Sequence, residues 1–128
     1  MANRKAHDRG MKTRRKVLGD EWVDRAIATQ TSFNAEFQEL ITRYAWDEIW
    51  NRPGVPHKVR RMLVIGTMVA LGRWEEFQLH VRAALASGDL DENDIKEVLL
   101  QQAIYCGVPA ANTAFKEARA IIEEVKRK

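Results

Sequence analysis

The chain has 128 residues, the length of one ordinary domain, and it is 45% hydrophobic and 30% charged, which is typical of a folded globular protein. Its single cysteine, Cys106, excludes an internal disulfide framework, and three widely spaced histidines argue against a metal site formed by one chain. The net charge of +3 is uneven, because residues 1–19 are strongly basic. We therefore expect one domain over residues 1–128, with a basic N-terminal arm at residues 1–9.

The apolar pattern predicts a protein without a membrane anchor. The longest apolar stretch, residues 62–71, has about half of the roughly 20 residues that a membrane helix needs. No apolar segment of a secretory signal follows the basic arm, so we expect a cytoplasmic protein. We interpret the basic arm as a solvated tail or as a segment that clasps a neighbouring subunit. A nucleic-acid site is less favoured, because the rest of the chain has no basic surface with aromatic residues of the kind that binds RNA.

Helical periodicity dominates the chain, and no run of β-branched residues alternates with polar ones. We expect an all-α bundle of six to seven helices. Glycine, proline and capping residues place these helices near residues 9–18, from 20 onward, 32–50, 56–71, 73–87, from a cap at 91 to a break at 107, and 109–126. The segment after Arg61 is apolar nearly all round, which predicts that its helix is the central one.

The expected helix 32–50, capped by Ser32, carries aromatic residues on two sides. Arg43, Trp46 and Trp50 follow one another at i, i+3 and i+7, on a flank different from that of Phe37 and Tyr44. One interpretation is a core face plus an oligomer interface. The other is that Arg43 and the two tryptophans form the wall of a pocket for a small anion.

The expected helix 73–87 places Arg73, Glu76 and His80 along one border of its apolar face. Such a trio could bind an anion and transfer a proton, although an exposed ion-pair ladder has the same spacing. On the next helix, Gln102 falls on the apolar stripe and must find a polar partner if it is buried, and either Gln102 or Glu97 could face the same cavity as His80.

Four segments together resemble the carboxymuconolactone decarboxylase family. They are RWEEFQLHVRAAL from Arg73, DIKEVLLQ from Asp94, AIYCGVPAAN from Ala103 and LITRYAWDEIWNRPG from Leu40. The last of these resembles the decarboxylases of the family more than its wider superfamily. The resemblance covers about residues 10–125, nearly the whole chain.

The resemblance implies an alkylhydroperoxidase D-like helical fold that assembles as a homotrimer or homohexamer. It also implies a cofactor-free carboxy-lyase that converts 4-carboxymuconolactone to the enol-lactone of β-ketoadipate in protocatechuate breakdown. The peroxidases of the superfamily carry Cys-x-x-Cys-x-x-x-His where this chain has Arg73-x-x-Glu76-x-x-x-His80. Because both thiols are absent, dithiol peroxidase chemistry is excluded.

The chemistry of that reaction suggests roles for the candidate residues. Arginine binds carboxylates through paired hydrogen bonds, which favours Arg43 and Arg73 over Arg60 and Arg82 as substrate anchors. His80 is the expected proton donor or oxyanion partner, because an imidazole titrates closest to neutral pH, and Glu76 would orient it or act as the acid. Further substrate contacts are expected from the remaining candidates: Trp46, Trp50, Tyr44, Gln102 and Glu97.

Two alternatives stay open at this point. One is a related isomerase or hydrolase acting on a lactone or keto acid with the same His80 and Glu76. The other is a helical oligomer without enzymatic activity that binds nucleic acid through its basic arm.

Overall fold

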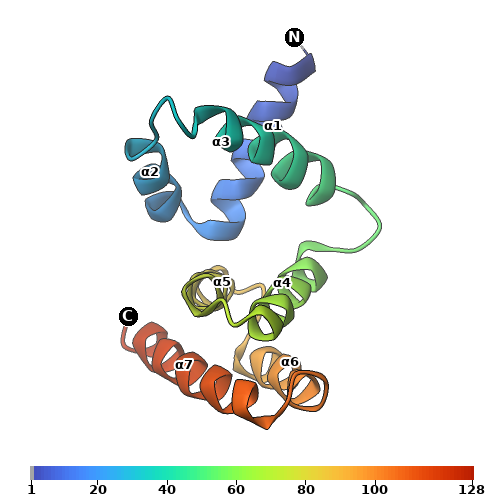
Figure 1. The fold of residues 1–128 in the computed structure, drawn as a ribbon, viewed down its shortest axis with the longest axis vertical. Coiled ribbons are helices and arrows are strands. Elements are labelled where there is room, and N and C mark those ends of the chain that lie inside the picture. Colours follow the sequence, from blue (N-terminus) through green and yellow to red (C-terminus); the bar gives the residue numbers. More distant parts are fainter. Residues whose placement is uncertain (1) are drawn as a thin grey trace. The chain divides into compact units, whose positions relative to one another are not determined.

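The computed structural model describes residues 2–128, and within that range every regular element is a helix (Figure 1). The prediction of an all-α fold with six to seven helices is therefore confirmed: the described residues form seven α-helices and one π-helical segment, η1. The chain forms two compact units, Met1–Val55 and Pro56–Lys128. No described helix has the length and apolarity that crossing a membrane requires.

The N-terminal unit consists of four elements: α1 (Ala2–Leu18), α2 (Asp20–Ala28), α3 (Ala35–Ile41) and η1 (Thr42–Ile49). Two of the predicted boundaries are wrong. Helix α1 begins at Ala2 instead of near Arg9, so the basic arm is a continuous part of a helix. Helix α3 begins after Asn34 instead of at Ser32, because the side-chain oxygen of Asn34 accepts a hydrogen bond from the Thr31 N–H (2.9 Å) and holds this segment in a turn.

Helix α1 packs along η1, and this packing needs a glycine. A Cβ atom at Gly10 would overlap the backbone carbonyl of Thr42, so a larger residue cannot occupy that position without moving one of the two elements. The π-helical geometry of η1 continues to its end, where the Trp50 N–H donates to the carbonyl of Ala45, five residues earlier (2.9 Å). Residues of η1 therefore point in directions that an α-helical wheel does not predict.

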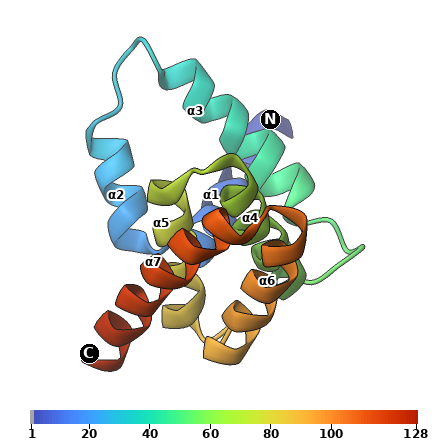
Figure 2. The same ribbon diagram turned by 60° about the horizontal axis from the view of Figure 1, so that its bottom comes forward.

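The C-terminal unit consists of α4 (His57–Leu71), α5 (Trp74–Ser87), α6 (Glu92–Tyr105) and α7 (Val108–Lys126) (Figure 2). The predicted boundaries agree with these closely. Gly72 and Gly88 end α4 and α5 in the left-handed conformation, which glycine adopts without strain. Helix α6 begins with a capping box, in which the side chains of Asp91 and Asp94 each accept a hydrogen bond from the other's backbone N–H.

Helix α4 contacts the other three helices of this unit, but it is not buried all round. Ile65 and Val69 are almost completely buried, whereas Leu63 and Leu71 are 62% and 66% exposed. The helix predicted to be central does contact every other helix of its unit, yet its apolar surface is not completely covered in the single chain. The reason is geometric, since α5, α6 and α7 cover one side of α4 and leave the other apolar side uncovered.

Candidate functional site

The residues predicted for the site lie in both units. Five belong to the C-terminal unit: Arg73, Glu76, His80, Glu97 and Gln102. Four belong to the N-terminal unit: Arg43, Tyr44, Trp46 and Trp50. Each set is described within its own unit.

The charged residues at the start of α5 form an exposed ion pair, one of the two arrangements that their spacing allows. The Nε atom of Arg73 donates to Oε1 of Glu76 at 2.9 Å, and the two side chains are 62% and 36% exposed. Exposed ion pairs of this kind contribute little to stability, so the pair can exchange for another partner at small cost. Arg73 is therefore accessible to an anion that competes with Glu76.

His80 lies one turn further along α5 and is largely buried. Its Nδ1 atom is buried without a hydrogen-bond partner in the described part of the chain. Burial, helped by the positive charge of Arg61 and partly opposed by the carboxylate of Glu76, lowers the pKa of His80 to about 4. The expectation that His80 titrates near neutral pH therefore does not hold, and its imidazole is neutral at pH 7.

The positive charge next to His80 belongs to Arg61, a buried residue that the sequence pattern marked only as the start of an apolar stretch. Arg61 of α4 is 1% exposed, and its Nε atom donates to Oδ2 of Asp89 at 2.9 Å. A buried guanidinium needs such a partner. The available sequence signal was that Arg61 directly borders the apolar α4 segment, where a charged residue must be either exposed or paired.

Helix α6 contributes two candidates in different environments. Gln102 is partly buried, and its Nε2 atom donates to the backbone carbonyl of Gly66 at 3.0 Å, so the prediction that Gln102 finds a polar partner is confirmed. Glu97 is exposed and forms no hydrogen bond or ion pair with any residue from 2 to 128. Cys106 is half-buried at the end of the same helix and packs against the core.

In the N-terminal unit, Arg43 and the tryptophans face different surroundings. The Nε atom of Arg43 donates to Oε1 of Glu39 (3.2 Å), and Arg43 lines a surface hollow together with Tyr44. Trp46 and Trp50 are buried and stack on each other, with ring centroids 5.2 Å apart, and neither lines that hollow. The two tryptophans therefore do not share this hollow with Arg43, and a pocket formed by all three stays a prediction.

Residues 35–120 match the sequence model of the carboxymuconolactone decarboxylase family. This match covers α3 to most of α7, which is more than half of the chain. The protein belongs to the carboxymuconolactone decarboxylase family. The family resemblance seen in the sequence is thus confirmed, and α5, with its Arg73, Glu76 and His80, lies inside the matched region.

Individual members of the family are similar over most of their length. The chain is 34% identical to 4-carboxymuconolactone decarboxylase of Acinetobacter baylyi, over 98% of this chain and 92% of that protein. It is 37% identical to nitrosuccinic acid decarboxylase of Metarhizium robertsii, over 96% of this chain and 85% of that protein. A shorter match, 51% identical over 45 residues, is with 4-carboxymuconolactone decarboxylase of Pseudomonas putida and covers 35% of this chain and 94% of the Pseudomonas sequence.

Proposed function

We propose that this protein is a carboxy-lyase that decarboxylates 4-carboxymuconolactone to the enol-lactone of β-ketoadipate, a step in protocatechuate breakdown. The support is the near full-length similarity to a decarboxylase of that name, together with the α5 residues. The observation that carries the mechanism is the neutral imidazole of His80, whose buried Nδ1 has no partner among the described residues.

The substrate supplies its own electron sink. Loss of CO₂ breaks the bond between a ring carbon and a carboxylate, and the electron pair moves through the double bond toward the lactone carbonyl. Negative charge then develops on the carbonyl oxygen, and a proton must be added next to that carbonyl. No metal or organic cofactor is needed for this step, so the protein has to hold two carboxylates, stabilise the oxyanion and place a proton donor.

In this proposal, neutral His80 donates an N–H hydrogen bond to the developing oxyanion. A largely buried donor acts in a medium of low dielectric constant, where its hydrogen bond to an anion is stronger than in water. Because the imidazolium is scarce at neutral pH and Glu76 is paired as a carboxylate with Arg73, the proton added to carbon comes from a bound water molecule in this proposal.

The proposed carboxylate anchors are Arg73 and Arg43. Each is already paired with a glutamate, Arg73 with Glu76 and Arg43 with Glu39, and all four side chains are at least 32% exposed. A substrate carboxylate would therefore replace one carboxylate by another, an exchange with a small energetic cost. The remaining contacts, from Tyr44, Trp46, Trp50, Glu97 and Gln102, stay predictions.

A second candidate activity is favoured by the similarity to nitrosuccinic acid decarboxylase. Nitrosuccinic acid is also a dicarboxylic acid with an electron-withdrawing group, and loss of CO₂ beside a nitro group leaves a nitronate whose charge lies on oxygen. The same oxyanion donor and the same two carboxylate anchors would serve both substrates. The related isomerase or hydrolase remains the alternative in which all carbon atoms of the substrate are retained.

The nucleic-acid alternative is less favoured by the contacts of α1. Arg9 forms two hydrogen bonds with the carboxylate of Asp47, and Arg4 and His7 also lie within ion-pair distance of acidic residues. Part of the positive charge of the arm is therefore already balanced inside the N-terminal unit.

We also propose a closed homo-oligomer, a trimer or a hexamer. Several large apolar side chains are more than half exposed in the single chain, and contiguous exposed apolar surface marks interfaces. They are Phe33, Phe37, Tyr44, Leu63, Leu71, Ile104, Tyr105 and Val108. Sedimentation velocity at micromolar concentration tests this proposal, and a monomer alone would contradict it.

The decisive experiment measures CO₂ release and identifies the product by NMR, with 4-carboxymuconolactone and with nitrosuccinate as separate substrates. We expect CO₂ and the enol-lactone from the first. His80→Ala should fold but lose at least about a hundredfold in kcat, with a smaller change in KM, because the arginines make the ground-state contacts. CO₂ from nitrosuccinate alone would replace the first proposal by the second, and a product that retains all carbon atoms would overturn both.

A further inference from the structure

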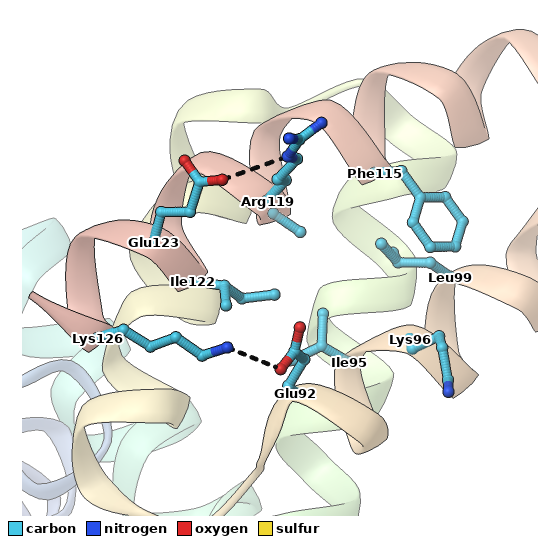
Figure 3. A pocket seen from close by; sticks show the side chains of 10 residues that line it. Glu92, Ile95, Lys96, Leu99, Phe115, Arg119, Ile122, Glu123 and Lys126 are labelled. Atoms are coloured by element: carbon cyan, nitrogen blue, oxygen red, sulfur yellow. Dashed lines mark hydrogen bonds and ion pairs between the residues drawn. The ribbon is translucent and has the colours of Figure 1, made fainter.

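A groove lies between α6 and α7 of the C-terminal unit, and none of its lining residues belongs to the candidate site (Figure 3). Its volume of about 350 Å³ is at the lower end of the range for small-molecule sites. It would hold about twelve water molecules at roughly 30 Å³ each, so it admits a ligand of about that many non-hydrogen atoms.

The inside of the groove is apolar. Ile95, Leu99 and Ala118 are at most 2% exposed and form its floor, while Phe115 and Ile122 stand beside them. No polar side chain lies on this floor to satisfy a polar group of a ligand. The part of a ligand that enters the groove must therefore be hydrocarbon.

The rim of the groove has a surplus of positive charge. Arg119 pairs with Glu123 and Lys126 with Glu92, both at 3.3 Å, so these four charges balance (Figure 3). The fifth charge is that of Lys96, which forms no hydrogen bond or ion pair with any described residue. Its amine points away from Phe115 in Figure 3, but the side chain is exposed and can reach the rim by rotation about its own bonds.

We propose that this groove binds a monoanionic amphiphile, with a saturated hydrocarbon chain of about ten carbons on the apolar floor and one carboxylate at Lys96. The unbalanced charge of Lys96 selects an acidic head group over a neutral or cationic one. The apolar floor selects the hydrocarbon chain over a second polar group. This site is separate from the proposed decarboxylation, so the test does not use turnover.

The probes are sodium decanoate and, as a charge control, decyltrimethylammonium bromide, each titrated below its micelle concentration into the purified protein and followed by calorimetry. We expect saturable binding of decanoate and binding of the cation at least about tenfold weaker. Lys96→Gln should weaken decanoate binding by about tenfold. Lys116→Gln is the matched control, because it removes the same single positive charge at an exposed position of α7 that lies outside the groove.

A second variant tests the apolar floor. Phe115→Ala removes a partly exposed ring from the groove, so it should weaken decanoate binding while thermal unfolding shows a folded protein. Equal affinity for the two amphiphiles, or equal effects of Lys96→Gln and Lys116→Gln, would overturn the proposal. A third result would also overturn it: the wild type does not bind decanoate, and Phe115→Ala changes the oligomeric state. In that case a second copy of the chain would cover the groove.

Discussion

The pH dependence of folding stability gives a direct measure of the environment of His80. Its pKa is about 4 in the folded protein and about 6.5 in an unfolded chain. Between these values the unfolded chain binds a proton that the folded protein does not bind, so the free energy of unfolding decreases as the pH falls from 6.5 to 4. The difference corresponds to about 3 kcal/mol in all, of which about 2 kcal/mol is lost between pH 7.5 and pH 5.

The assay is urea unfolding of the wild type and of His80→Gln at both pH values, followed by circular dichroism. His7 and His57 are present in both proteins, so their titration cancels in the comparison. We expect the loss of stability on acidification to be about 2 kcal/mol smaller in His80→Gln. An equal loss in the two proteins, or an NMR titration of the His80 ring with a midpoint near 6.5, would refute the assignment of a neutral buried imidazole.

Three further predictions concern single residues. Arg61→Gln removes the positive charge beside His80, so the pKa of His80 measured by NMR should rise. It should stay below 6.5, because burial is the main cause of the lowered pKa and remains in the variant. An unchanged pKa would contradict an electrostatic effect of Arg61 on His80. Gly10→Ala should destabilise the N-terminal unit by more than about 2 kcal/mol in urea unfolding, and Gly54→Ala, which meets no atom within 4 Å, should have little effect. Cys106→Ala should keep most decarboxylase activity, because the proposed mechanism uses no thiol. A complete loss of activity in a folded protein would contradict this and would require a thiol mechanism.

Helix ends were predictable wherever a single residue type controls the backbone. Gly72 and Gly88 adopt positive φ angles that few other residues adopt without strain, and the structure ends α4 and α5 at these positions. The start of α3 was predicted wrongly because Ser32 and Asn34 are both good capping residues. The choice between them depends on the hydrogen bond of Asn34 to the Thr31 N–H, which the residue types alone do not determine.

The π-helical segment was not predictable from a helical wheel. A spacing of 100° per residue assumes hydrogen bonds between residues i and i−4, whereas the Trp50 N–H bonds to the carbonyl of Ala45. The wheel correctly separated the tryptophans from Tyr44, which is 56% exposed while Trp46 is 9% exposed. It grouped Arg43 with the tryptophans, but Arg43 is 32% exposed and pairs with Glu39, whereas both tryptophans are buried.

The neutral state of His80 fits a reaction on a dicarboxylate better than the protonated state that the residue type alone suggested. An imidazolium would attract the carboxylate that has to leave and would stabilise the ground state as much as the transition state. A neutral N–H donor interacts weakly with the ground-state carbonyl and more strongly with the oxyanion that forms as CO₂ departs. Burial on α5 and the nearby charge of Arg61, held by Asp89, both favour this neutral form, so the surroundings of His80 favour selective binding of the transition state in the proposed reaction.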